Sequence, residues 1–336
     1  MKKVLFATTA LVLSAGVAAA EVSTGGTARM GVAYNGNDGV KDWNFSSRIR
    51  VKFTLSGQTD GGLEFGASLR ADQANTANST GAAGAAYISG AFGKVSMGDT
   101  VGASEALFGD LPEVGYTDLD GAGFGAAAMH LGQNRPNLGA NEIPYLTGDD
   151  GGTQFDGYNS GPNVLYTGTF GAYSIAASMS DGKDTGREGQ KSPNGSVDQE
   201  AAIAAAYTFG NYTVGAGYEF ISGANGMEDK SQAELVGTAA FGNTSVKAYY
   251  AKGGKANTLD QGYGLGVTSV FGATTVLGYV QHIENSFDGP MSQDGTTYGI
   301  GAAYDLGGGA SVVGGVADSD IDGTGTQADL GMKFSF

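Results

Sequence analysis

Cysteine is absent from this sequence of 336 residues, and proline occurs only 6 times. Without cysteine there is no disulfide, no thiolate nucleophile and no zinc-thiolate site. Low proline beside 60 glycines, 16 phenylalanines and 16 tyrosines is unlike a disordered linker, in which proline rises and aromatics are few. Basic residues are also scarce, 18 against 34 acidic ones. Because phosphate binding requires a basic surface, we expect no nucleic-acid partner.

Long apolar runs and clustered histidines are missing as well. After the N-terminal segment, no stretch approaches the roughly 18 consecutive apolar residues of a membrane-spanning helix. His130 and His282 are isolated from each other, and the sequence has no Gly-x-Ser-x-Gly element for a hydrolase. We therefore expect no enzyme, because neither histidine has catalytic or metal-binding partners in the sequence.

The N-terminus has the composition of a secretory signal peptide. Lys2 and Lys3 precede an apolar run over residues 4–17, and three alanines at 18–20 form a small-residue cleavage site before Glu21. The sequence predicts that residues 1–20 are cleaved on export. Residues 21–336 then form a single domain.

Residues 43–56 give the clearest structural pattern. One set of alternate positions is mainly apolar: Trp43, Phe45, Ser47, Ile49, Val51, Phe53 and Leu55. The other set is polar: Asn44, Ser46, Arg48, Arg50, Lys52, Thr54 and Ser56. This period of two predicts a strand with one apolar and one polar face. Fourteen residues is long for a soluble protein and typical of a tilted strand that crosses a bilayer.

The pattern recurs along the chain and is interrupted by tight glycine turns. Phe-Gly pairs occur at 92–93, 170–171, 209–210, 241–242 and 271–272, and glycine-rich turns occur at 57–62 and 306–309. Seven tight turns give fourteen strands, and one strand at each end, at 23–34 and 326–336, gives sixteen. Short turns on one rim and long polar loops on the other are typical of outer-membrane barrels. The predicted fold is all-β, a transmembrane 16-stranded antiparallel up-and-down β-barrel.

Residues 101–161 break this rhythm. The segment is acidic, with Arg135 as its one cation, and it is too long for an ordinary structureless loop in a compact domain. A barrel of sixteen strands encloses an aqueous channel rather than a packed core. This segment is the connection long enough to fold into that lumen.

Several runs resemble a known family. They are Arg29-Met30-Gly31-Val32, Asp42-Trp43-Asn44-Phe45, Gly62-Leu63-Glu64-Phe65, Ser104-Glu105-Ala106-Leu107-Phe108-Gly109-Asp110, Tyr116-Thr117-Asp118-Leu119-Asp120 and Ile143-Pro144-Tyr145-Leu146, with the C-terminal Phe336. The sequence is similar to the general, non-specific porins of purple phototrophic alphaproteobacteria (Rhodobacter-type porins). The resemblance implies a homotrimer of sixteen-stranded barrels whose third loop, here 101–161, folds inward and constricts the pore. Residues 121–141 depart from it as a longer insertion.

The resemblance also implies a basic wall opposite an acidic loop at the pore constriction. The predicted basic wall is Arg29, Arg48, Arg50 and Arg70, with Lys52 as a weaker candidate. The predicted acidic residues of the loop are Glu105, Asp110, Glu113, Asp118, Asp120, Glu142, Asp149 and Asp150. Arg48 and Arg50 lie two residues apart on one strand face, so an opposing acidic surface would offset their repulsion.

The predicted function is a general diffusion porin of the bacterial outer membrane. It would carry small hydrophilic solutes and ions passively, with outer-membrane lipid, lipopolysaccharide and two further copies of itself as partners. The acidic net charge predicts a modest cation preference. The alternatives are a substrate-specific channel of the same barrel class and a non-channel surface barrel. No cofactor is expected to be required. Structural Ca²⁺ near acidic loops is an expectation without an assigned site, and Asp318, Asp320, Asp322, Gly323 and Asp329 have a spacing like that of a calcium loop.

Overall fold

The computed structural model describes most of the chain from residue 20 onward. The described ranges are 20–37, 41–74, 77–119, 141–147, 163–180, 197–223, 228–254, 257, 259–285 and 294–336. Residues 1–19 of the predicted signal peptide and most of the predicted insertion at 121–141 lie outside them.

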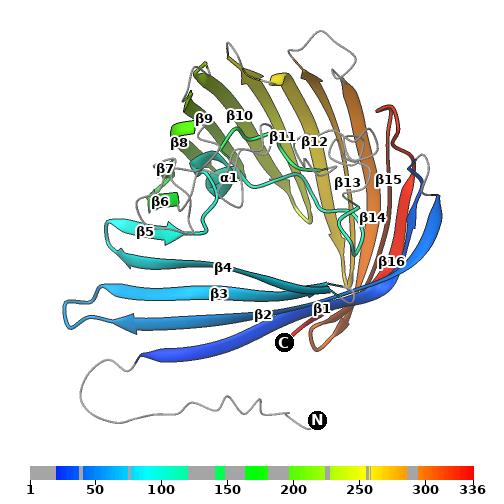
Figure 1. Cartoon of the computed structure of the whole chain (residues 1–336), viewed down its shortest axis with the longest axis horizontal. Coiled ribbons are helices and arrows are strands. Elements are labelled where there is room, and N and C mark those ends of the chain that lie inside the picture. Colours follow the sequence, from blue (N-terminus) through cyan, green and yellow to red (C-terminus); the bar gives the residue numbers. More distant parts are fainter. Residues whose placement is uncertain are drawn as a thin grey trace.

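Sixteen strands form the fold. They are β1 Glu21–Asn35, β2 Asp42–Gln58, β3 Glu64–Ala74, β4 Ala77–Gly90, β5 Gly93–Gly98, β6 Asn163–Phe170, β7 Tyr173–Ser180, β8 Val197–Phe209, β9 Tyr212–Gly223, β10 Lys230–Phe241, β11 Thr244–Gly253, β12 Leu259–Phe271, β13 Thr274–Asn285, β14 Gly295–Gly307, β15 Ala310–Ser319 and β16 Gln327–Ser335. Each strand pairs antiparallel with its sequence neighbours, and β1 pairs with β16 to close the barrel. The prediction of a closed sixteen-stranded barrel is confirmed (Figure 1).

The two faces of the wall have the predicted parity. On β2, Phe45 is 91% exposed and Ile49 53% exposed on the outer face, while Arg48 and Arg50 point to the inner face and are partly buried. A one-residue slip would place those arginines in lipid at about 2–4 kcal/mol each. Hydrophobic burial is therefore inverted relative to a soluble barrel, because the apolar band is external.

Aromatic side chains line the rim that carries the short turns. Tyr173 and Tyr207 have ring centroids 4.9 Å apart, and Phe209 continues the contact to Tyr212 at 5.6 Å. Glycines with positive φ close the turns, for example Gly210 at 58°. Amphipathic rings at this level are typical of the boundary between lipid and water.

The buried apolar core consists of the long connection between β5 and β6 packed against the inner wall. Leu111, Val114, Ile143 and Tyr145 of the connection are 0–2% exposed. They belong to a cluster that includes Tyr249 of β11. Figure 1 shows α1 (Ala103–Phe108) and the trace that follows it inside the barrel. The sequence did not predict α1, which has only six residues.

Among the described residues, no helix has both the length and the apolar character needed to cross a membrane.

Candidate functional site

Glycines on the inner wall make room for the connection, which we call the inner loop (described residues 99–119 and 141–147). A Cβ on Gly315 of β15 would lie 2.5 Å from Val114, and one on Gly331 of β16 would lie 2.9 Å from the Tyr116 ring. The same crowding recurs around the barrel at Gly31, Gly215, Gly217, Gly264, Gly266 and Gly301. A lumen-facing glycine thus lets the loop backbone approach the sheet closely. The glycine-rich inner face found in the sequence is the surface on which the loop packs.

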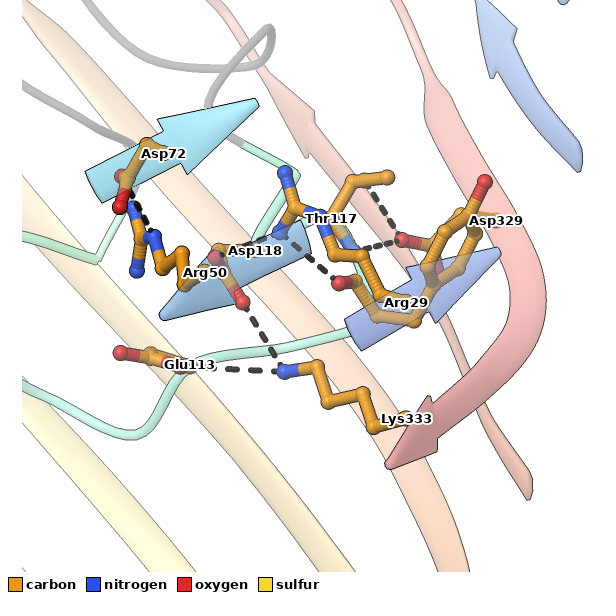
Figure 2. A network of polar contacts seen from close by, with 9 residues as sticks. Arg29, Arg50, Asp72, Glu113, Thr117, Asp118, Asp329 and Lys333 are labelled. Atoms are coloured by element: carbon orange, nitrogen blue, oxygen red, sulfur yellow. Dashed lines mark hydrogen bonds and ion pairs between the residues drawn. The ribbon is translucent and has the colours of Figure 1, made fainter. Parts of the chain in front are cut away.

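The far end of the first described segment is hydrogen-bonded to β16. The backbone N–H of Thr117 donates to Asp329 Oδ2 at 2.7 Å, and the Thr117 hydroxyl donates to the same oxygen at 2.6 Å (Figure 2). The Asp329 side chain lies on the inner face and is 5% exposed. These bonds fix the backbone directly before Asp118.

Three cations lie side by side on the inner wall. Arg29 of β1 is in register with Lys333 of β16 on one side and with Arg48 of β2 on the other. Like charges directly opposite each other destabilise a sheet. The row therefore requires nearby negative charge.

The inner loop supplies that charge. Asp118 Oδ2 lies 3.1 Å from Arg29 Nη1, and Asp118 Oδ1 lies 3.1 Å from Lys333 Nζ. Glu113 lies 3.9 Å from the same lysine (Figure 2). Asp118 and the following Leu119 have φ of 72° and 51°, a region that is costly for residues other than glycine. The loop thus adopts a strained backbone where its carboxylate meets two cations.

A second arrangement on the same wall involves Asp72 of β3. Its Oδ2 accepts from Arg50 Nε at 2.8 Å, and its Oδ1 lies 3.0 Å from Arg70 Nε. The carboxylate that offsets Arg50 is therefore on the wall itself rather than on the loop. Among the described residues, Arg48 has no carboxylate within ion-pair distance.

A water-accessible cavity of about 230 Å³ lies beside the row of Arg29, Arg48 and Lys333. It is lined by Arg29, Arg48, Arg50, Lys333, Glu113 and Asp118, with Thr27, Ala28, Phe334 and Ser335. The Glu113 side chain is 65% exposed and that of Lys333 is 34% exposed, whereas those of Arg29 and Asp118 are only 15% and 20% exposed. The end of the row at Lys333 and Glu113 is therefore the part most open to solvent. Partial desolvation, and then the negative charge of Asp118, raise the pKa of Glu113 above its usual range.

Across the barrel, at β9 and β10, hydrogen bonds hold the inner loop to the wall, and no ion pair between described residues contributes there. Glu219 of β9 accepts hydrogen bonds from the backbone N–H groups of Leu146 and Thr147 and, at 2.8 Å, from the Thr147 hydroxyl. Glu234 of β10 accepts from the Ser104 hydroxyl at 3.0 Å. Ser104, near the start of the inner loop, and Leu146 and Thr147, at the end of its second described segment, thus contact the neighbouring strands β10 and β9.

Lys247 of β11 holds the segment between these two sides. Its Nζ donates to the carbonyl of Phe108 at 2.6 Å and to that of Asp110 at 2.7 Å. The amine thereby contacts the backbone directly after α1, where helix carbonyls lack partners of their own.

The predicted loop acids separate into different environments. Only Glu113 and Asp118 contact the basic row among the described residues. Asp110 Oδ1 accepts from the backbone N–H of Ile143, which ties the two loop segments together, and Glu105 lies in the first turn of α1. Glu142 lies in the second described segment of the inner loop, residues 141–147. Asp120, Asp149 and Asp150 lie outside the described residues.

Lys333, Asp72 and Asp329 were missed as members of this network. Lys333 has the inward parity of the last strand, which could have identified it. Asp329 was grouped by spacing with Asp318, Asp320 and Asp322, but it lies within β16 and binds Thr117. That part of the calcium-like pattern is a coincidence of sequence spacing. In the part of the chain that is described, no group of three or more His, Asp or Glu side chains could hold a metal ion.

His282 lies on the outer face near the long-loop rim. Its ring contacts Tyr263, and its Nδ1 lies 3.0 Å from the Thr296 hydroxyl. His130 lies outside the described residues. His282 is therefore a polar residue of the outer surface.

The chain resembles known proteins over nearly its whole length. A family model described as Gram-negative porin matches residues 7–324. A porin of Rhodobacter capsulatus is 52% identical over an alignment that covers 94% of this chain and all of that relative. A porin of Fuscovulum blasticum is 29% identical over 324 residues with the same coverage.

Solved structures agree with this result. A porin structure with 48% sequence identity superposes with a TM-score of 0.75 and covers 94% of this chain and 100% of its own. A variant of the Rh. blastica porin, 24% identical, has a TM-score of 0.66 over the same shares and supports the fold alone.

Proposed function

The chain belongs to the Gram-negative porins, and from that premise we propose how its interior sets the size limit and the ion preference of the channel. It is a general diffusion porin of the bacterial outer membrane, and its transport is passive. The proposal concerns the inner loop, the charges around it, the oligomer and the lipid contacts.

We assign the size limit to the inner loop. An open barrel of sixteen strands would leave a wide aqueous channel. The loop occupies part of this cross-section, because its apolar side chains pack on the inner faces of several strands. These strands include β9, β10, β11, β12, β15, β16 and β1. Residues 120–140 and 148–162 lie outside the described residues.

The ion preference follows from charges held opposite each other. Arg29, Arg48 and Lys333 form the basic side, and Glu113 and Asp118 are the nearest acids of the loop. Fixed charges of this kind select permeating ions and orient dipolar solutes. The observation that carries the proposal is Asp118 in contact with both Arg29 and Lys333, since it joins the loop to the row. With 34 acidic against 18 basic residues, we propose a net cation preference that the arginines moderate.

Three further parts of the proposal concern the environment of the barrel. Residues 1–20 are proposed as a cleaved signal peptide. The barrel is proposed to assemble as a homotrimer, and its apolar outer band to contact lipid, with lipopolysaccharide around the long-loop rim. Transport is proposed to require no cofactor, and structural Ca²⁺ near the acidic loops stays an expectation without an assigned site.

Liposome swelling with neutral sugars of graded size tests the size limit. The rate should fall smoothly with solute size for a general porin whose inner loop sets the cutoff. A single sugar that enters much faster than its size allows would favour a substrate-specific channel. Absence of swelling would favour a non-channel barrel. Single-channel recording in the same preparation should show closure in three equal steps for the trimer.

A further inference from the structure

Positive charge exceeds negative charge around the cavity beside the basic row. The side chains that line it include four cations and two carboxylates, namely Arg29, Arg48, Arg50, Lys333, Glu113 and Asp118. The whole sequence has a formal net charge of −16, so this excess is local. Asp72 of β3 pairs with Arg50 and lowers the excess without removing it.

The register of the strands places no carboxylate beside Arg48. Its partner on β1 is Arg29, and its partner on β3 is Ala74. Asp72 instead lies opposite Arg50 and accepts from Arg50 Nε at 2.8 Å (Figure 2). The carboxylate of the wall is therefore bound to the neighbour of Arg48, two residues along β2.

The loop carboxylates are held at the other end of the row. Asp118 lies 3.1 Å from both Arg29 Nη1 and Lys333 Nζ. Glu113 lies 3.9 Å from the same lysine. Lys333 and Arg48 flank Arg29 on opposite sides, since Arg29 is in register with both. Among the described residues, the Arg48 guanidinium therefore keeps N–H donors for an acceptor that enters from the channel water.

Hydroxyl groups extend this donor surface toward the short-turn rim. Thr27 of β1 is in register with Arg50 on one side and with Ser335 of β16 on the other. Thr27 and Ser335 both line the cavity. A hydroxyl can donate to an oxygen atom of a ligand. Arg48, Arg50 and Thr27 thus form a corner of the cavity with donors from two neighbouring strands, which we call the donor corner.

The donor corner matches an oxyanion better than a halide. A guanidinium presents its N–H groups as a planar fork that bonds two oxygens of a phosphate or carboxylate at once. Two such groups and a hydroxyl serve the several oxygens of a tetrahedral dianion, whereas a halide offers a single atom. The cavity of about 230 Å³ is far larger than one water molecule requires, so the ion fits with some of its hydration water.

We propose that the donor corner binds a dianionic tetrahedral oxyanion, of the class of inorganic phosphate and phosphate monoesters. The proposal rests on the proposed function, because the ligand reaches the corner through the channel. A bound dianion cancels part of the charge of the basic row. The channel should therefore prefer cations more strongly while phosphate occupies the site.

Calorimetric titration of the assembled porin with potassium phosphate tests the site directly, at mildly alkaline pH and with potassium chloride at matched ionic strength as the reference. The parent should bind phosphate saturably and show no such heat with chloride. Arg48→Gln removes both the charge and the fork, so it should weaken phosphate binding about tenfold or more. Arg48→Lys keeps the charge without the fork and should weaken binding less, but measurably. It decides the matter if Arg48→Gln does not assemble.

Lys94→Gln is the matched control for the loss of one cation from the lumen. Lys94 of β5 has the opposite parity to Met97, which is 57% exposed on the outer face, and its Nζ lies 4.3 Å from the centre of the Tyr87 ring. It does not line the cavity of the basic row. Lys94→Gln should therefore bind phosphate as the parent does.

Several results would overturn the proposal. They are a parent that binds phosphate no better than chloride, Arg48 variants that bind like the parent, and a loss in Lys94→Gln as large as in Arg48→Gln. The last result would assign the binding to the general field of the lumen.

Zero-current potentials separate the site from the channel function. Added phosphate should raise the cation preference of the parent and leave that of Arg48→Gln unchanged. A conducting parent that does not bind phosphate would reject the site and keep the porin function. Binding by a parent that does not conduct would reject the channel and keep the site. Binding without any change in the potential would contradict the link between the donor corner and ion preference.

Discussion

The inner loop meets the barrel through two different chemistries. Along β16, β1 and β2 it presents Asp118 and Glu113 to a row of cations in an open, water-accessible cavity. Along β9 and β10 it is held by two buried side chains. Glu234 accepts from the hydroxyl of Ser104, and Glu219 accepts from the backbone N–H of Leu146.

The difference separates electrostatics from positioning. The exposed ion pair of Glu113 with Lys333 contributes about 0–1 kcal/mol to stability. The charges that line the cavity act on any ion that passes. Buried hydrogen bonds to charged groups contribute about 1.5–3 kcal/mol each, yet their charges are far from the channel water. We infer that the β9–β10 side determines where the loop lies, whereas the β16–β2 side determines which ions pass.

The largest effect is expected from crowding the positioning side with Gly217→Ala. The new Cβ would lie 2.6 Å from Glu234 Oε2 and 3.2 Å from Ser104 Cβ, so the start of the loop must move. Overpacking of this kind costs about 1–3 kcal/mol. Single-channel conductance should change clearly while ion preference changes little. Gly237→Ala on β10, where no atom lies within 4 Å, is the control and should behave like the parent. Normal conductance in Gly217→Ala would show that this side does not set the loop position.

An intermediate effect is expected from Arg48→Ala combined with Arg50→Ala on the electrostatic side. The removal of two cations and their bulk should increase conductance and shift the channel toward cations, while the barrel still assembles. Arg70 continues to pair with Asp72 in this variant. Lys252→Ala, which removes an outward-facing cation paired with Asp260, is the matched control. Unchanged conductance in the double variant would place these arginines away from the constriction.

The smallest effect concerns Glu113, a single partly exposed carboxylate. Its pKa is raised, so it takes up a proton on acidification at a higher pH than an ordinary glutamate, whose pKa is about 4.3. Cation preference should therefore begin to fall at a higher pH than an ordinary glutamate at this position would produce. Zero-current potentials measured down a pH series should show this early step in the parent and lose it in Glu113→Gln. An identical pH profile in both proteins would contradict the assignment.

The sequence predicted the wall of this protein better than its interior. Strand parity and glycine turns are local signals, so the sixteen strands and the inward direction of Arg48 and Arg50 could be obtained from them. Contacts between the loop and the wall join residues that are far apart in the sequence, up to 215 positions for Asp118 and Lys333, and no local pattern records them.

Two features lay between these extremes. In the sequence, the strand positions that alternate with the apolar ones are unusually small and rich in glycine. Only the packing of Val114 and Tyr116 on these glycines shows why they are small. Glu219 and Glu234 have the inward parity of their strands, yet a periodic pattern cannot distinguish a solvated lumen acid from a buried one. Burial depends on the path of the loop, which the sequence left open.

The zero-current potential across a planar bilayer in a KCl gradient tests the electrostatic model of the pore most directly. The inner loop brings carboxylates into contact with the basic row, and acidic residues outnumber basic ones in the chain, so the potential should have the sign of a modest cation preference. Asp118→Asn should reduce that preference. An anion-selective parent channel, or a preference that ignores Asp118→Asn, would contradict the model.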